Sequence, residues 1–283
     1  LAVFGSSRVP FTKFTVTAGN DGDVVMNSVV IQRTGVINKA AFSGVELLDE
    51  DGNLVGTSKT LNSNDQATVG VAITIPRGMS KTFTIAGDMT STSPSSYAGQ
   101  VGGLSVVAIN TSATVSGSLP IVGASHTFNS NLVIGTADVT TSSFDPDSAQ
   151  TKNIGDTAVR MAGVLITAGS AEDIRVRSIR WYQTGSAGAN DIANLKVVVG
   201  GTEYPVTVST DGKYYTSNFG SGIMVAKGFS TDVYIKGDVV GSSAATRTVI
   251  FNLDRTTDLY VTGEKYGYGI SPTTSASTAS ATT

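Results

Sequence analysis

The sequence contains two copies of one pattern, offset by 150 residues. Phe14–Gly35 reads FTVTAGNDGDVVMNSVVIQRTG, and Val164–Gly185 reads VLITAGSAEDIRVRSIRWYQTG. At the same offset, IAGD at 85–88 aligns with IKGD at 235–238. A repeat of this length far exceeds the period of a solenoid, so it predicts two copies of one domain. The 283 residues are enough for two domains that each bury a core.

The strand signals in both copies predict an all-β fold. Apolar residues do not recur at helical spacing, whereas short alternating runs rich in Val, Ile, Thr, Phe and Tyr are separated by Gly, Asn, Asp and Ser. About seven such runs per copy predict two tandem immunoglobulin-like antiparallel β-sandwich domains. The alternation slips by one residue at Asn27-Ser28 and again at Arg177-Ser178, which predicts a β-bulge in each copy.

The offset also predicts where the domains begin and end. We expect a first sandwich over residues 1–118, an interdomain segment over 119–137, a second sandwich over 138–263 and a Ser/Thr-rich tail over 264–283.

Composition excludes several classes of function. Cysteine is absent, which excludes thiol catalysis, cysteine-ligated zinc and disulfides. The net charge of −3 offers no basic surface for nucleic acid, and no apolar run reaches the length of a membrane span. Only 14% of residues are charged, so Ser, Thr, Asn and Gly must supply the polar surface. This surface, and a first residue (Leu1) that is not methionine, lead us to expect an exported protein at the cell surface or outside the cell.

The two copies differ at their ends. The first copy has no counterpart of residues 120–150, so we expect its sandwich to lack a strand. Behind the second copy, Tyr266, Tyr268 and Ile270 alternate like a spare strand. An unpaired sheet edge accepts strands from neighbours. One hypothesis is therefore head-to-tail assembly, in which the C-terminal segment of one subunit docks on the first domain of the next.

Two alternatives to that hypothesis stay open. Strand addition could run the other way, through the N-terminal residues Leu1, Val3 and Phe4. Alternatively, the first domain simply lacks the strand and the tail is a linker.

A row of arginines is a second candidate for subunit contact. Arg175, Arg177 and Arg180 are predicted to share the outward face of one strand. The acidic turn at Asp49–Asp51 could pair with this row between subunits. The alternative is a solvated surface.

Acidic pairs raise the question of calcium, which prefers oxygen ligands. The weak candidates are Asp145 and Asp147, between the copies, and Asp21 and Asp23. The run 49–53 resembles the start of a calcium loop, but no glutamate follows at the required spacing, so a hairpin turn is predicted there. No other cofactor is expected.

Catalytic and sugar-binding signals are weak. His126 is the only histidine, and no G-x-S-x-G nucleophile motif accompanies it. We therefore expect no catalytic residues. Trp181 is predicted to face the core. Tyr204, Tyr214 and Tyr215 form the one candidate aromatic cluster for glycans, and the alternative is that they pack within the domain. Asn110 begins an N-glycosylation sequon, Asn-Thr-Ser.

The chain resembles the Ser/Thr-rich, cysteine-free immunoglobulin-like repeats of prokaryotic cell-surface proteins. The residues that carry the resemblance recur in both copies, and in the first they are Thr15–Gly19, Asp23–Ile31, Arg33–Gly35, Ile75–Gly78 and Ile85–Asp88. Such repeats occur in S-layer, adhesin and filament proteins. The resemblance implies a structural subunit of an extracellular filament or surface layer whose partners are copies of itself. The alternative is an adhesin or carbohydrate-binding module with a glycan or cell-surface partner, and a hydrolase ranks third.

Overall fold

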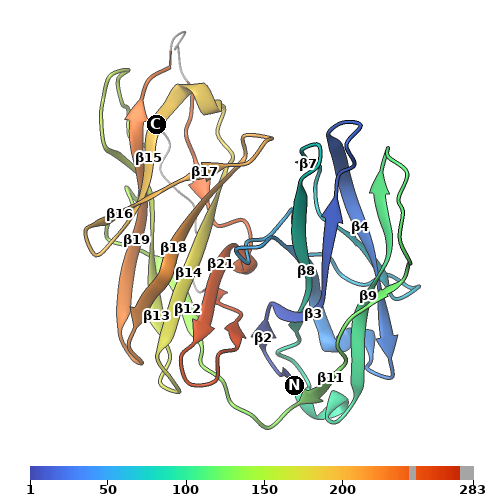
Figure 1. Ribbon diagram of the computed structural model, residues 1–283. Coiled ribbons are helices and arrows are strands. Elements are labelled where there is room, and N and C mark those ends of the chain that lie inside the picture. The colour runs from blue at the N-terminus through green and yellow to red at the C-terminus, as the bar shows by residue number, and fades with distance from the viewer. Residues whose placement is uncertain (242–246, 275–283) are drawn as a thin grey trace. The chain divides into compact units, whose positions relative to one another are not determined.

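The computed structural model describes residues 1–241 and 247–274 (Figure 1). The chain divides into two compact units, Leu1–Ile134 and Gly135–Thr283. The described residues contain β-strands and four short 3-10 helices, η1 (Lys39–Ala41), η2 (Pro94–Tyr97), η3 (Ala189–Asp191) and η4 (Thr256–Asp258). The prediction of an all-β fold built from antiparallel sandwiches is confirmed.

The first unit contains two sheets that enclose one hydrophobic core. One sheet has the order β1-β11-β9-β4-β6, with β10 beside β9 and β7 beside β4, and the other has the order β3-β8-β5. The strands are β1 (Ala2–Val3), β2 (Ser6–Ser7), β3 (Val9–Thr17), β4 (Val24–Gly35), β5 (Phe42–Leu48), β6 (Gln66–Val69), β7 (Ile73–Ile75), β8 (Ser80–Met89), β9 (Val101–Thr111), β10 (Ile121–Val122) and β11 (His126–Asn129).

The second unit also encloses its core between two sheets. One has the order β16-β15-β19-β13-β12-β23, and the other contains β17-β18-β14-β21-β22, with β20 beside β14. The strands are β12 (Ala137–Thr141), β13 (Val159–Ala168), β14 (Ile174–Gln183), β15 (Ile192–Val199), β16 (Thr202–Pro205), β17 (Thr207–Val208), β18 (Tyr214–Val225), β19 (Ser230–Val239), β20 (Phe251–Asn252), β21 (Leu259–Gly263), β22 (Gly269–Ile270) and β23 (Thr273–Thr274).

The predicted β-bulges are present in both units. The pairing register shifts between Met26 and Ser28 in β4, and between Val176 and Ser178 in β14. Because a bulge moves later side chains to the opposite face, it keeps the apolar residues on both sides of the slip in the core.

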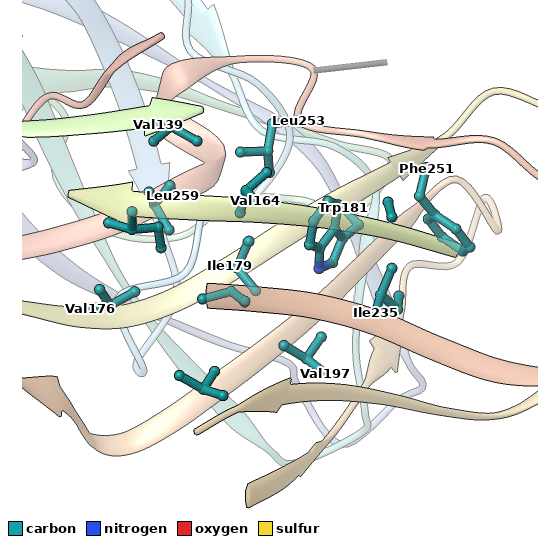
Figure 2. Packing of buried hydrophobic residues seen from close by; sticks show 14 of the residues in the cluster. Val139, Val164, Val176, Ile179, Trp181, Val197, Ile235, Phe251, Leu253 and Leu259 are labelled. Carbon is teal, nitrogen blue, oxygen red and sulfur yellow. The ribbon is translucent and has the colours of Figure 1, made fainter. Parts of the chain in front are cut away.

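Trp181 lies in the core of the second unit, as its alternating position predicts (Figure 2). Its side chain is 1% exposed and packs among aliphatic residues of the core, including Val164 and Ile235 from the facing sheet. Tyr215 is also buried, with its ring edge-on to Phe251 at 5.0 Å between centroids. Packing therefore accounts for two aromatic residues that could otherwise suggest a ligand platform.

Residues 119–137, expected between the domains, contribute strands to both units. β10 and β11 pair with β9 in the first unit, and β12 begins at Ala137 in the second. The first compact unit consequently extends to Ile134 rather than to residue 118. These pairings join residues about 20 apart in sequence, which local alternation does not reveal.

Candidate functional site: an open strand edge in the first unit

The two units differ at one edge of a sheet, the one that contains β3 in the first unit and β13 in the second. In the second unit, β13 lies between β19 and β12 and is paired on both sides. In the first unit, the equivalent strand β3 pairs with β8, and no strand lies on its other side within residues 1–241 and 247–274. This matches the expectation that the first copy lacks a strand.

The hydrogen-bond pattern identifies which backbone groups face the open side. The N–H of Ala18 donates to Met79 at 3.0 Å, so alternate residues from Ala18 backward point toward β8. The backbone groups of Lys13, Thr15 and Thr17 therefore point away from β8, toward the open edge. These residues present N–H donors and C=O acceptors in a row, as an edge strand does.

The second unit shows how the same edge is filled. The N–H of Ala168 donates to Phe229 in the same way, at 2.9 Å, while the N–H of Gly169 donates to Thr136 at 2.8 Å. β12 then runs antiparallel along β13, with Val139 opposite Ile166. A strand of five residues thus satisfies the outward backbone groups of β13.

Part of the β3 edge is covered by its own unit. The N–H of Ala124 donates to the carbonyl of Phe11 at 2.8 Å, and His126 Nε2 donates to the carbonyl of Pro10 at 2.9 Å. The ring of His126 also meets Phe11 edge-on, with centroids 4.9 Å apart. This contact occupies the start of β3 and leaves the edge open from Lys13 onward.

A groove of about 710 Å³ lies beside the open part of β3. Its apolar lining comes from Val16, Val24, Met26 and Ile109, and residues 113–119 are also among its lining. The groove is thus bounded by the backbone edge and by apolar core side chains together. An extended peptide with apolar residues at alternate positions could pair with the backbone edge and place its apolar side chains in the groove.

Equivalent core positions are less buried in the first unit than in the second. Val16, Val24 and Ile109 are half-buried, whereas their counterparts 150 residues later are 0%, 0% and 2% exposed. These counterparts are Ile166, Ile174 and Leu259. The groove therefore exposes side chains at positions that are buried in the second unit.

Glu172 helps to close the second unit, and sequence reasoning did not single it out. This buried carboxylate accepts hydrogen bonds from the N–H groups of Gly135 at 2.6 Å and Lys265 at 2.8 Å. It therefore joins the approach to β12 with the turn between β21 and β22. The position equivalent to Glu172 in the first unit is Gly22, which has no side chain to do this. This difference between the aligned copies is the sequence signal that could have identified Glu172.

The C-terminal residues expected to form a spare strand are used within the second unit. Ile270 is 2% exposed, belongs to the core and pairs with Val261, and β23 pairs in parallel with β12. The spare-strand interpretation of Ile270 is corrected accordingly, because β21 already provides its partner. Tyr268 is half-buried and Tyr266 is 40% exposed. Residues 275–283 of the tail lie outside the described residues.

The N-terminal candidates pack within the first unit. β1 pairs in parallel with β11, Val3 is fully buried, and the N–H of Phe4 donates to Asn129 at 2.9 Å. Phe4 is half-buried, and Leu1 is 56% exposed. Donation of this strand to another subunit would require these contacts to be broken.

Two of the predicted arginines form polar contacts on the outer face of the second unit. Arg175 forms a two-pronged ion pair with Glu264, at 2.6 and 2.8 Å, and this hydrogen bonding lowers the pKa of Glu264. Arg177 donates to the hydroxyl of Thr262 at 3.0 Å. The charge of Arg175 is therefore matched within the same unit.

Arg180 differs from the other two because it is buried. Its guanidinium bonds to Asp258, with the Nε donating at 2.7 Å, and it stacks over Tyr214 at 4.3 Å from the ring centroid. Burial raises the pKa of Asp258, against the lowering effect of Arg180. In the acidic turn at Asp49–Asp51, Asp49 accepts from the N–H groups of Asp51 and Asn53 and shapes its own hairpin turn. Pairing of this turn with the arginines between subunits stays a prediction.

The calcium candidates mainly hold local backbone. Asp23 accepts from the N–H of Arg77 at 2.8 Å, and Asp145 accepts from Asp147 at 2.9 Å and Gly163 at 2.8 Å. Asp21 is exposed and is among the residues that line the groove. Within the described ranges, no three acidic or histidine side chains lie close enough together to hold a metal ion.

An aromatic pair on the second unit is a separate surface feature. Phe144 and Tyr234 stack with centroids 4.9 Å apart, and the guanidinium of Arg160 lies 4.8 Å from the Phe144 ring centroid. Two hollows of about 540 and 420 Å³ both include Phe144 in their lining, and the smaller one also includes Tyr234. The predicted cluster is dispersed by comparison, since Tyr204 packs against Phe219 and Tyr215 is in the core.

Comparison with known proteins yields distant similarities in structure. No family model and no curated protein matches the chain. Among 29 matching solved chains, the C-terminal domain of the Streptococcus pyogenes antigen I/II-family protein AspA has a TM-score of 0.27 and 11% identity, over 99% of this chain and 95% of that one. An anti-sigma factor domain-containing protein has a TM-score of 0.22 and 11% identity, over 92% and 82%.

The serine-rich repeat adhesion glycoprotein Srr1 from Streptococcus agalactiae has a TM-score of 0.19 and 9% identity, over 91% of this chain and 85% of that one. Likenesses at these scores carry no argument about function. In the part of the chain that the structure describes, no helix has the length and apolar character needed to span a bilayer.

Proposed function

We propose that the chain is a structural subunit of an extracellular filament or surface layer, and that copies associate through the open edge of the first unit. The observation that carries this proposal is the combination of outward backbone groups at Thr15 and Thr17 with the apolar groove beside them. Main-chain bonds at such an edge supply affinity, and alternate side chains in the groove supply specificity.

Surface chemistry supports the extracellular part of the proposal. The chain carries few charges for its length, contains no cysteine and is rich in Ser and Thr. Its repeated motifs resemble those of prokaryotic surface proteins. The proposed mechanism is mechanical, since it needs strand pairing and apolar contact and no chemical step.

Two substitutions at one residue test the proposed contact. Thr15→Pro removes an outward N–H without removing a bond to β8, whereas Thr15→Ala keeps the N–H. We expect the natural chain and Thr15→Ala to form ordered assemblies in negative-stain microscopy, and Thr15→Pro to remain dispersed. Circular dichroism should show that all three are folded. Equal assembly of both variants, or a natural chain that stays monomeric in sedimentation at every concentration, would contradict the proposal.

The second candidate function is glycan binding by an adhesin-type module. The observation that favours it is the Phe144–Tyr234 pair, with Arg160 over the Phe144 ring and two hollows that Phe144 helps to line. Aromatic faces stack on sugar rings, and Phe144→Ala should then abolish binding on a glycan array. A monomeric chain with an array signal that depends on Phe144 would favour this function over the first.

A further inference from the structure

We propose that the occupant of the groove is the C-terminal segment 279–283 of a second copy, added antiparallel to β3. This proposal rests on the proposed function and names the partner segment. It differs from donation of residues 266–270, which are occupied within the second unit.

The internal duplication defines what kind of segment the groove accepts. In the second unit, β12 fills the equivalent edge with the sequence Ala-Asp-Val-Thr-Thr. Its residues alternate between core and surface: Ala137 and Val139 are each 1% exposed, whereas Asp138 is half-buried. An occupant of the first unit should therefore have small apolar residues two apart, separated and followed by hydroxyl or acidic residues.

The end of the chain has that pattern. Residues 279–283 read Ala-Ser-Ala-Thr-Thr, which is identical to β12 at three of the five positions. One difference exchanges Ser for Asp at a position that faces outward in β12. The other replaces Val by Ala at a position that faces the core. The five residues follow directly in sequence after residues 275–278.

The β12 register predicts each contact of the docked segment. Ala137 lies opposite Ala168 and Val139 lies opposite Ile166. Moved back by 150 residues on the acceptor strand, these pairs place Ala279 opposite Ala18 and Ala281 opposite Val16. Ala281 then points into the groove beside Val16, where a valine stands in the second unit. The docked segment therefore underfills the groove by two methyl groups.

This underfilling leads to a sharp test with synthetic peptides of residues 275–283. The receptor is a chain that ends at Thr274, so that its own tail cannot compete. Fluorescence anisotropy should show binding of the natural peptide and roughly tenfold tighter binding of the Ala281→Val peptide, because it buries additional methyl surface. Ala281→Asp should abolish binding, since it places a charge in the groove. The matched control is Ser280→Asp, which puts the same side chain on the outer face and should bind like the natural peptide.

The receptor side of the test uses the same pair of variants as before. Thr15→Pro in the chain ending at Thr274 should lose the peptide, and Thr15→Ala should retain it. Equal effects of Ala281→Asp and Ser280→Asp would overturn the proposed register, and no binding of any peptide would overturn the proposed occupant.

Sedimentation velocity separates failure of this inference from failure of the proposed function. The full chain should self-associate, and the chain ending at Thr274 should stay monomeric. If both chains associate equally, the tail is not the occupant although assembly stands. If the full chain is monomeric and the peptide still binds the shortened chain, the tail binds within its own copy, which overturns both the second-copy partner and the proposed assembly.

Discussion

Gly123 lies where the chain passes over the start of β3. A Cβ at this position would overlap the carbonyl oxygen of Phe11 and the Cα of Thr12, both of which are backbone atoms. Because backbone cannot move aside as a flexible side chain does, Gly123→Ala should displace the segment that carries His126. We expect it to destabilise the first unit by about 1–3 kcal/mol, the usual range for overpacking.

Gly19 provides the matched control for this prediction. It lies two residues after the end of β3, and a Cβ there meets no atom within 4 Å. Gly19→Ala should change the free energy of unfolding by less than about 0.5 kcal/mol. Chemical denaturation followed by circular dichroism measures both variants, and equal stabilities would contradict the close contact at Gly123.

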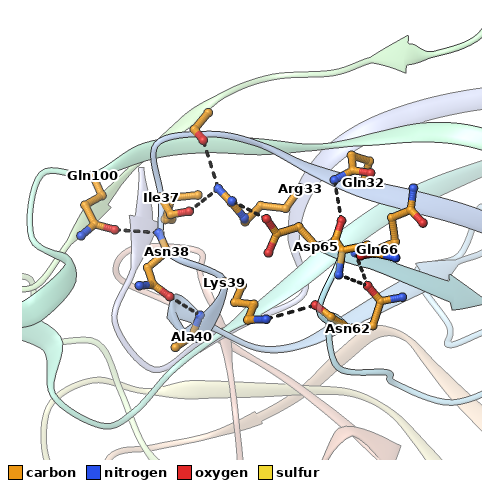
Figure 3. A network of polar contacts seen from close by, with 12 residues as sticks. Gln32, Arg33, Ile37, Asn38, Lys39, Ala40, Asn62, Asp65, Gln66 and Gln100 are labelled. Atoms are coloured by element: carbon orange, nitrogen blue, oxygen red, sulfur yellow. Dashed lines mark hydrogen bonds and ion pairs between the residues drawn. The ribbon is translucent and has the colours of Figure 1, made fainter.

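Asp65 forms an ion pair with Arg33 in the first unit (Figure 3). The side chain of Arg33 donates to Asp65 at 2.7 Å, and this hydrogen bond lowers the pKa of Asp65 below its ordinary value of 3.8. A carboxyl with a lowered folded-state pKa adds stability above its unfolded-state pKa and loses that stability as the pH falls through the folded-state value. Asp65→Asn should therefore lower the denaturation midpoint at neutral pH.

The difference between natural chain and Asp65→Asn should shrink steadily once the pH falls below 3.8, and close at the folded-state pKa and beneath it. Asp21→Asn, at an exposed carboxyl of the same unit, is the control and should leave the midpoint unchanged. A difference that stays constant from neutral to acidic pH would show that the Asp65 contribution is not ionic.

The same valine-to-alanine substitution can be made in β12, which pairs along the edge of β13, and in β3, whose edge is unpaired. Val139 is 1% exposed and lies opposite Ile166, whereas Val16 is half-buried beside the groove. Val139→Ala should destabilise the second unit by about 2 kcal/mol, and Val16→Ala should destabilise the first by less than about 1 kcal/mol.

The sole tryptophan makes this comparison measurable. Because Trp181 is in the second core, its fluorescence reports unfolding of the second unit, while circular dichroism reports both. In dilute protein, equal losses from Val139→Ala and Val16→Ala would mean that Val16 is already covered, and that the edge is not open.

At the scale of strands, the alternation of apolar residues and the 150-residue offset predicted the β-bulges and the missing strand. A slip in the period at Asn27-Ser28 is visible in sequence because a bulge changes which residues are apolar. The missing strand of the first unit was also predictable, because β12 has no aligned counterpart. Ile270 shows the limit: its alternation is the same whether it pairs with β21 or with another molecule, and only the fold and the Glu172 contact distinguish these cases.

The same limit applied to the candidate contact residues. Spacing placed Arg175 and Arg180 on one face but could not reveal that Glu264 and Asp258 neutralise them, because those partners lie more than 70 residues away. The groove itself was also beyond prediction, since residues 113–119 have no regular pattern and line it through long-range packing. The sequence did identify the unit that contains the groove, because the first copy lacks a counterpart of β12.

At the scale of the whole molecule, the second unit serves as an internal reference for the first, because both units repeat one sequence pattern. Each has two sheets around its core and the same bulge, but among residues 1–241 and 247–274 a strand pairs with the outer side of β13 and none with that of β3. We therefore propose that the first unit receives from a second copy the edge strand that β12 supplies within the second unit.

Hydrogen exchange of the full chain over a dilution series tests this claim most directly. In the second unit, the outward N–H groups of Leu165 and Thr167 face β12, so they should exchange slowly at every concentration. In the first unit, the equivalent N–H groups of Thr15 and Thr17 should exchange quickly in dilute protein and slow down as copies associate. Association with unchanged, fast exchange at Thr15 and Thr17 would place the contact elsewhere and contradict the account.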